Sequence, residues 1–220
     1  MPPEAPPALD FRTAPPPTRK EIEIAQALAA AAAPPKPQHD QPRPQHEIDW
    51  VRSFHGISEQ PFSERAAYIL SSPLNVADIE VKPDGIVYLP EIKYRRILNA
   101  AFGPGGWAMV PRGDPIVRER IVTREYALII GGRFIAQAQG ESTFFSAESI
   151  PASVEACKSN ALMRCSKDIG IASELWDPVF IRAFRKKYAE QIWCEHVVNK
   201  TKRLLWTKIG VPVGYPFKKA

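Results

Sequence analysis

The stretch that decides the fold runs Glu119-Arg-Ile-Val-Thr-Arg-Glu-Tyr-Ala-Leu-Ile-Ile-Gly-Gly-Arg-Phe-Ile-Ala-Gln-Ala-Gln-Gly-Glu-Ser-Thr-Phe-Phe145. It contains two segments rich in β-branched and aromatic residues, 119–130 and 133–145, separated by Gly131-Gly132. Two glycines between such segments are typical of a tight hairpin, because both tolerate the positive φ that the turn requires. We therefore predict two long antiparallel strands here, with a shorter strand upstream over 107–110.

Helices are predicted on both sides of these strands. Over 90–102, Pro90 suits the start of a helix, Gly103-Pro104 suits its end, and apolar residues between them recur at helical spacing. A longer helix is predicted over 153–169, ending at Gly170.

Two further helices are predicted, over 63–70 and 178–190, and turn signals make 71–85 a loop. The order of helix, three strands, helix and helix indicates an α+β fold. We expect a β-β-β-α core, with an antiparallel sheet packed on helices.

Proline divides the chain into parts. Thirteen of the 23 prolines lie in residues 1–61, a segment without sustained apolar periodicity apart from a possible short helix over 20–33. Such a segment buries too little apolar surface to offset the entropy of ordering it. We expect a disordered Pro/Ala-rich arm over 1–61, a folded core over 62–190 and a basic C-terminal tail over 191–220.

The start of the chain shows no clear targeting signal. Acidic residues at Glu4, Asp10, Glu21 and Glu23 depart from an Arg-rich, acid-poor mitochondrial presequence. We expect either a processed or trimmed form or atypical targeting. The chain has no apolar run long enough for a membrane span.

Positive charge is concentrated at the C-terminus. Residues 182–220 contain ten Lys/Arg and two Asp/Glu, a net charge of +8, whereas the whole chain has a net charge of +5. One reading is a solvated tail that keeps the protein soluble. The other interpretation is a positively charged surface that binds the phosphates of a nucleic acid.

Several chemistries find no support in the sequence. The four histidines lack metal-ligand spacing, and Cys157, Cys165 and Cys194 form no CxxC pair. The glycines of 103–106 lack the lysine and the strand-to-helix context of a phosphate-binding loop. We expect no catalytic residues, no metal and no cofactor.

Candidate DNA-binding residues are cations of the helices and tail, with one aromatic residue on which a base can stack. For the helix cations the competing interpretations are a solvated helix face or an intersubunit salt bridge. Lys158 falls among apolar positions of its helix. Its ammonium must therefore snorkel to solvent, form an ion pair, or face a neighbouring subunit or a ligand. For Trp206, Tyr215 and Phe217 the competing reading is packing of the tail on the core or on a neighbouring subunit. The candidates are Lys93, Arg96, Lys158, Arg164, Lys167, Arg182, Lys186, Lys187, Lys200, Lys202, Arg203 and Trp206.

Several unusual strings carry a resemblance to a known family. They include Ile79 to Trp107, Ile121-Val-Thr-Arg-Glu-Tyr126, Cys157-Lys-Ser-Asn-Ala-Leu-Met-Arg-Cys165 and Ser173-Glu-Leu-Trp-Asp-Pro-Val-Phe-Ile181. From about residue 62 to the basic tail, the chain resembles the fungal mitochondrial genome maintenance family. That family in turn resembles the single-strand annealing proteins of the Rad-fifty-two type.

The resemblance implies a ring-shaped homo-oligomer that binds single-stranded DNA, and duplex DNA more weakly, and anneals complementary strands without ATP. It implies a location in the nucleoid of the mitochondrial matrix and a role in recombination and repair of mitochondrial DNA. It places groove cations at Lys93, Arg164, Lys167 and Arg182, with Met163 where the superfamily has a lysine. The alternative functions are RNA binding and structural packaging of DNA in the nucleoid.

Overall fold

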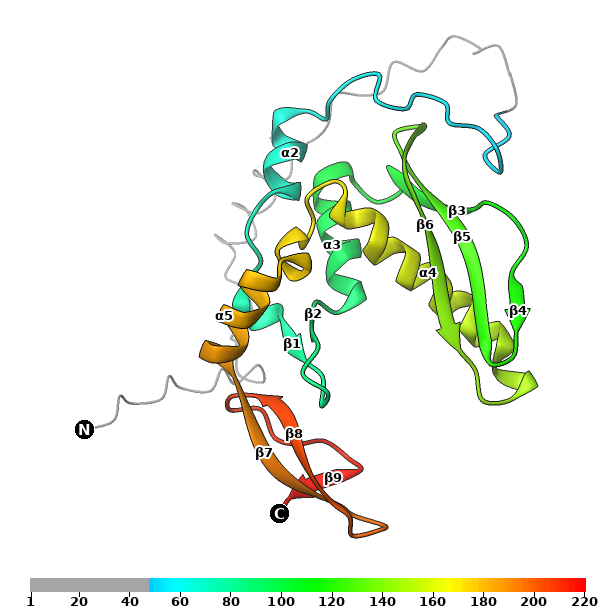
Figure 1. Ribbon diagram of the computed structural model, residues 1–220. Helices are drawn as coiled ribbons and strands as arrows, with labels where there is room; N and C mark the ends of the chain where they lie inside the picture. Colours follow the sequence, from blue (N-terminus) through cyan, green and yellow to red (C-terminus); the bar gives the residue numbers. More distant parts are fainter. Residues whose placement is uncertain (1–47) are drawn as a thin grey trace, which may run out of the picture. The chain divides into compact units, whose positions relative to one another are not determined.

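The computed structural model describes residues 48–220 (Figure 1). Most of the predicted arm, with the possible helix over 20–33, therefore lies outside the described residues. The elements follow in this order: α2 (Glu64–Leu70), η1 (Val76–Asp78), β1 (Glu80–Val81), β2 (Val87–Tyr88), α3 (Glu91–Phe102), β3 (Trp107–Pro111), β4 (Ile116–Arg118), β5 (Ile121–Ile130), β6 (Arg133–Thr143), η2 (Ala147–Ser149), α4 (Ile150–Lys167), η3 (Ser173–Trp176), α5 (Pro178–Tyr188), β7 (Ala189–His196), β8 (Lys202–Lys208) and β9 (Phe217–Lys219).

The central sheet is antiparallel and is built on β5. Strands β3 and β4 pair along one side of β5, and β6 pairs along the other. Gly131 and Gly132 both have positive φ, as the predicted hairpin turn requires. The predicted mixed α+β fold with an antiparallel sheet is confirmed.

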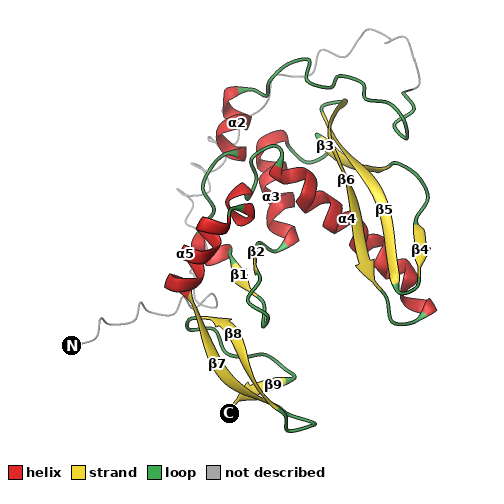
Figure 2. Cartoon of the chain, in the orientation of Figure 1, coloured by secondary structure: helices red, strands yellow, loops and turns green. Residues whose placement is uncertain are grey.

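Helix α4 lies along one face of this sheet (Figure 2) and encloses the main core with it. Leu98 of α3, Leu128 of β5 and Leu162 of α4 are fully buried in that core. The helix crosses β6 at Gly140, where an added Cβ would overlap the carbonyl of Cys157. Glycine at this position therefore permits the close approach of helix and sheet.

Three local predictions differ from the structure. The helix expected from residue 153 begins at Ile150, because Pro151 is tolerated in a first turn. Part of the predicted loop over 71–85 forms η1 and the strand β1, which pairs with β2. Strand β4 was not predicted, because it has three exposed residues and no inward-facing apolar side that an alternating pattern would reveal.

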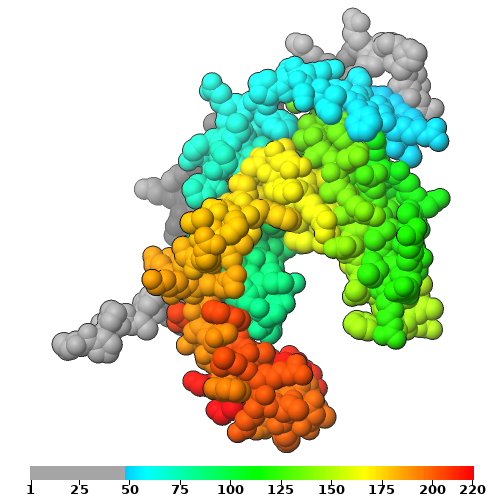
Figure 3. Space-filling view, viewed as in Figure 1, coloured from blue at the N-terminus to red at the C-terminus, as the bar shows by residue number. Residues whose placement is uncertain are grey.

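Residues 48–60 were assigned to the disordered arm, but the structure packs them against the sheet face opposite α4. Arg112 donates hydrogen bonds to the carbonyls of Trp50 and Ser53 at 2.9 and 2.7 Å. Phe54 packs edge-on against Phe134, with ring centroids 4.8 Å apart. In the space-filling view this segment lies over one end of the sheet (Figure 3). Because its partners lie some sixty residues away in the sequence, local composition alone could not reveal the packing.

The C-terminal segment was expected to be a tail, but it forms a three-stranded antiparallel sheet in the order β8-β7-β9. Helix α5 ends at Tyr188, two residues before the predicted end, and β7 follows directly. The sheet is attached to the rest of the described chain through Lys208. Its Nζ donates to the carbonyls of Val76, Ala77 and Ile79 at 2.8–3.1 Å.

Candidate nucleic-acid interface

Helix α4 presents polar side chains along the edge of β6. The Arg164 guanidinium lies 2.8 Å from the carboxylate of Glu141, and these side chains are 40% and 58% exposed. The Asn160 carbonyl oxygen accepts a hydrogen bond from the backbone N–H of Glu141. An ion pair this exposed contributes little net stability. Arg164 can therefore exchange the carboxylate for a phosphate at small cost.

One turn further along α4, Lys167 lies next to an aromatic ring. Its ammonium is 4.7 Å from the ring centroid of Trp176 in η3, and the indole is 51% exposed. The helix thus places two predicted cations, Arg164 and Lys167, on the side of an exposed indole.

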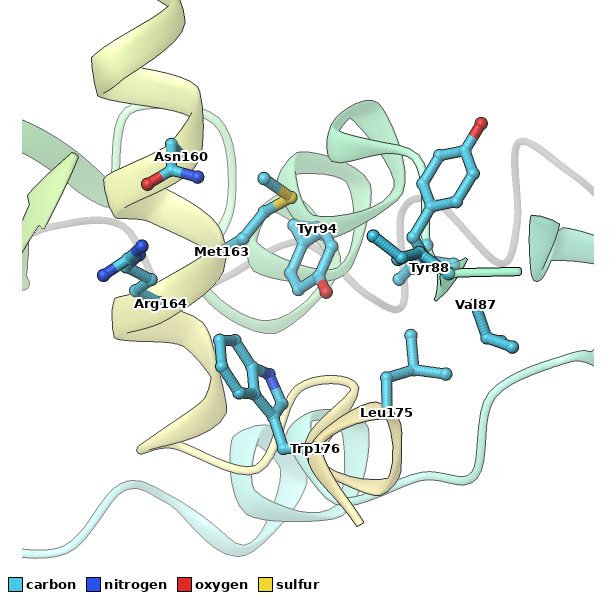
Figure 4. Close-up of a pocket in the computed structure, with 10 residues that line it drawn as sticks. Val87, Tyr88, Tyr94, Asn160, Met163, Arg164, Leu175 and Trp176 are labelled. Atoms are coloured by element: carbon cyan, nitrogen blue, oxygen red, sulfur yellow. The ribbon is translucent and has the colours of Figure 1, made fainter. Parts of the chain in front are cut away.

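A pocket of about 270 Å³ lies beside these groups (Figure 4). Met163 and Tyr94 face each other across it, and the Trp176 indole lies at its edge near Arg164. The Tyr94 side chain is buried, and this burial, with the nearby charge of Glu174, raises the pKa of its hydroxyl to about 12. Tyr94 is thus a neutral hydrogen-bond donor at physiological pH.

The two α3 cations lie in a different hollow of about 320 Å³, beside the α2–η1 connection. Lys93 is 2.6 Å from the carboxylate of Asp78, and Arg96 is exposed nearby. Leu89 is the residue that lines both hollows. The structure therefore does not bring Lys93 and Arg164 together in one pocket.

Lys158 is half-buried on α4 and has no ion-pair partner within residues 48–220. Two of the alternatives for it, snorkelling and contact with a neighbour or ligand, therefore remain open. Its neighbour Cys157 packs in the core, as predicted for a small apolar side chain.

Helix α5 and β8 form a basic hollow of about 460 Å³ lined by Arg182, Arg185, Lys186 and Trp206, with Glu190 as its acidic member. The guanidinium carbon of Arg185 is 5.9 Å from the centroid of the Trp206 ring. The Arg185 Nε is buried, with no acceptor in the described part of the chain. Lys187 lies outside this hollow, with its ammonium 5.0 Å from the Tyr188 ring.

Trp206 is more restricted than a free stacking residue. Its backbone N–H donates to the Pro83 carbonyl at 3.0 Å, and its indole lies so close to Gly85 that an added Cβ would be 2.8 Å from the ring. The half-buried indole therefore packs on the turn between β1 and β2. These contacts favour packing of Trp206 on the core over stacking with a base. Tyr215, in contrast, is 83% exposed.

Trp193 of β7 is the residue that sequence reasoning missed. It is 61% exposed and lies directly opposite Leu204 of β8, on the same face of the sheet as Trp206. In β7, Trp193 is exposed between the half-buried Ile192 and the buried Cys194. All three residues are apolar, so no alternation of apolar and polar residues marks Trp193 in the sequence. The aromatic residues of the predicted tail that could dock on the core as a strand are Trp206, Tyr215 and Phe217, and Trp193 is not among them.

Cations surround this face of the C-terminal sheet. Lys202 and Lys218 both lie opposite Glu195 in the strand register, and Lys218 and Lys200 approach its carboxylate at 3.4 and 3.8 Å. Lys202 and Arg203 are exposed on β8, and Arg203 lies on the opposite face. One carboxylate thus neutralises part of the charge of a surface that is otherwise strongly positive.

Other chemistries are not evident in the described residues. Within residues 48–220, no cluster of three or more His, Cys, Asp or Glu residues is arranged to hold a metal ion. None of the helices described there is both long and apolar enough to cross a membrane. All three cysteines are buried as free thiols, and burial raises the pKa of the Cys165 thiol to about 12.

Comparison with known proteins gives a consistent result. Residues 49–218 match the family model described as "Mitochondrial genome maintenance MGM101". The chain is 56% identical to the mitochondrial genome maintenance protein MGM101 of Yarrowia lipolytica over 79% of the chain and 60% of that protein. It is 56% identical to the Kluyveromyces lactis protein of the same name (79% and 66%) and 54% identical to the Schizosaccharomyces pombe protein (77% and 63%). The chain thus spans less than two thirds of the length of these relatives.

Proposed function

Because this chain belongs to the mitochondrial genome maintenance MGM101 family, we propose that it binds single-stranded DNA and anneals complementary strands without ATP. Its proposed location is the nucleoid of the mitochondrial matrix, and its proposed role is recombination and repair of mitochondrial DNA. The proposal follows from the family together with the chemistry of the α4 edge and the C-terminal sheet.

The observation that carries the preference for single strands is the exposed Trp193 on a cationic sheet face. Bases of a duplex are stacked on each other, so an indole can stack on them only where they are unpaired. Lys202 and Lys218 lie on the same sheet face as that indole, where they can contact phosphates. The α5 cations Arg182 and Lys186 line the hollow beside Trp206 and can contact phosphates there. Phosphate contacts carry no sequence information, so they hold a strand of any sequence, which annealing requires.

Annealing follows from this mode of binding. A strand held by its phosphates and weakly stacked bases can exchange those contacts for pairing with a complementary strand. The base pairing of the new duplex supplies the free energy, so nucleotide hydrolysis is not required. A homo-oligomeric ring, also part of the proposal, would hold one strand across several subunits and keep its bases extended.

The test is annealing of two complementary labelled DNA strands in the absence of ATP and added metal. We expect fast annealing, tighter binding of single strands than of duplex, and a large particle in light scattering. Trp193→Ala is expected to weaken single-strand binding by about 5-fold or more, the lower end of the effect of losing one base–aromatic stack. Trp50→Ala, on the opposite side of the fold from α4, is the matched control.

Tight binding without annealing would overturn the annealing proposal and leave a packaging protein. Stronger binding of RNA than of DNA in competition would favour the RNA-binding alternative, because phosphates and stacked bases are common to both polymers.

A further inference from the structure

The pocket between β2, α3, α4 and η3, which we call the Tyr94 pocket, has features that phosphate binding does not use. It is lined by apolar and aromatic side chains, and polar groups occur at a few points only (Figure 4). We propose that the Tyr94 pocket receives one unpaired nucleobase of the bound strand. This inference rests on the proposed function and adds a base-binding site to it.

A hydrogen-bond donor that lines a pocket and has no protein partner can serve a ligand. The Tyr94 side chain is 3% exposed, and its hydroxyl has no hydrogen-bond partner among residues 48–220, yet the residue lines the pocket. The hydroxyl points into the space between Trp176 and Leu175 (Figure 4). Because the hydroxyl opens onto the pocket, a ligand that offers an acceptor there can gain a hydrogen bond.

Asn160 offers a second donor at the opposite wall. Its carbonyl oxygen is occupied by the N–H of Glu141 at 3.3 Å, which assigns the amide N–H₂ group to the other side. No acceptor for that group occurs in the described part of the chain. Tyr94 and Asn160 thus present donors, and the ring nitrogens and carbonyl oxygens of a nucleobase are acceptors.

The walls suit a flat, largely apolar ligand. The Trp176 indole provides an exposed aromatic surface, and Met163 and Leu175 provide apolar contact. The pocket volume of about 270 Å³ leaves room for one base. A base–indole stack tolerates any base, since every base has a π face.

Cations at the rim favour a nucleotide of a DNA strand over an uncharged apolar ligand. Arg164 lines the pocket, and the Lys167 ammonium lies over the ring of the same Trp176. A base in the pocket therefore carries its phosphate towards Arg164 and Lys167. Thymine, guanine and cytosine each offer at least one carbonyl oxygen to these donors, and adenine offers ring nitrogens, so every base can accept there.

The first experiment compares binding of an oligothymidine with binding of an abasic oligonucleotide of equal length. Met163→Trp fills the pocket without a change of charge, and Tyr94→Phe removes only the hydroxyl. We expect both variants to lower the preference for oligothymidine by about 3-fold or more while the salt dependence of binding stays as in the original protein. Tyr188→Phe is the matched control for the loss of a hydroxyl, and thermal melting verifies that each variant folds.

The second experiment locates the base directly. An oligonucleotide containing 4-thiothymidine is cross-linked to the protein by light, and the linked peptides are identified by mass spectrometry. Cross-links to Tyr94, Met163 or Trp176 are expected. Cross-links confined to Trp193 and Tyr215 would overturn the base pocket.

The outcomes separate the two proposals. If Met163→Trp keeps both the base preference and the affinity of the original protein, the base pocket is overturned while single-strand binding stands. If the original protein binds neither oligonucleotide, the proposed function itself fails. If free thymidine monophosphate binds in the pocket with the affinity of the oligonucleotide, the site belongs to a small nucleotide rather than to a strand, and the inference is overturned.

Discussion

Single side chains with several backbone partners hold distant segments of this protein together. Arg112 bonds to carbonyls of the segment around Trp50 and also lies 4.7 Å from the Phe54 ring centroid. Lys208 does the same for the η1 region. In both residues a cation satisfies carbonyls that lie outside the α-helices and sheets. The role of Arg112 and Lys208 is therefore structural.

Replacement of Arg112 tests the first of these contacts. Arg112→Ala leaves carbonyls near Trp50 and Ser53 without donors and removes the cation–π contact. We expect the free energy of unfolding to fall by about 1–3 kcal/mol, the cost of leaving such groups unpaired. Urea unfolding measures this loss, and hydrogen exchange of residues 53–57 should increase more than that of β5. If residues 53–57 exchange as slowly in Arg112→Ala as in the original protein, Arg112 does not hold this segment on the sheet.

Titration of Cys165 predicts a loss of stability at high pH. Burial raises the pKa of this thiol from 9.0 to about 12, so the folded state retains a proton that the unfolded state releases. The contribution is fully present below pH 9 and is lost as the pH rises towards 12.

Urea unfolding at several pH values checks the Cys165 prediction. The stability of the original protein should decline between pH 9 and 12, and Cys165→Ala should decline less steeply. Tyr94, whose pKa is also raised to about 12, contributes to the decline from pH 10 upwards in both proteins. Identical slopes in the two proteins would disprove the contribution of Cys165.

At the scale of elements, the crossing of α4 over β6 fixes the position of the candidate site. The backbone of α4 approaches Gly140 closely at Cys157, and the next two turns of the helix present Asn160 and Arg164 to the neighbouring Glu141. A helix held further from the sheet would move both side chains away from that strand edge. The packing distance and the site geometry are therefore linked.

Gly140→Ala tests this link. The added methyl group meets the Cys157 carbonyl, which is backbone and cannot move aside without a shift of the helix. We expect destabilisation of about 2–4 kcal/mol, at the upper end of the usual range for single substitutions, and weaker DNA binding. Gly113→Ala is the control, because nothing lies within 4 Å of its added Cβ. Denaturant unfolding measures the stability of both variants. If Gly140→Ala has the same free energy of unfolding as Gly113→Ala, the close approach of α4 to Gly140 is contradicted.

At the scale of the whole molecule, positive charge is distributed over two kinds of surface. One comprises the α4 edge with Arg164 and Lys167, and the other comprises α5 and the C-terminal sheet. Both combine cations with an exposed indole, Trp176 in the first and Trp193 in the second. A single strand contacting both would neutralise many phosphates, so its affinity should fall steeply with salt.

The salt dependence of single-strand binding tests the phosphate contacts at the proposed groove positions. Each phosphate contact that is removed should reduce the log–log slope by about 0.7. We expect this reduction for Arg164→Ala and for Lys93→Ala, the two groove positions implied by the family resemblance, with the fold intact. Arg65→Ala on α2 is the control. Fluorescence anisotropy at several salt concentrations gives the slopes, and unchanged slopes in both variants would contradict the groove assignment.

The sequence by itself determined the local elements and the family. The Gly131-Gly132 hairpin, the α3 helix and the concentration of charge near the C-terminus are readable because each depends on residues close together in the chain. The strings around Cys157 to Cys165 and Ser173 to Ile181 carried the family resemblance in the same way.

Only the tertiary structure decided which distant side chains meet. It placed residues 48–60 on the sheet, Trp206 on the β1–β2 turn, and Tyr94 opposite Met163 in one pocket. It also turned the expected tail into a sheet with Trp193 exposed on one face. The contacts of residues 48–60, of Trp206 and of Tyr94 join residues separated by about sixty to more than a hundred positions, whereas the strands of the C-terminal sheet pair within one segment. Their geometry depends on how the helices and sheets pack, which hydrophobic periodicity within one segment does not specify.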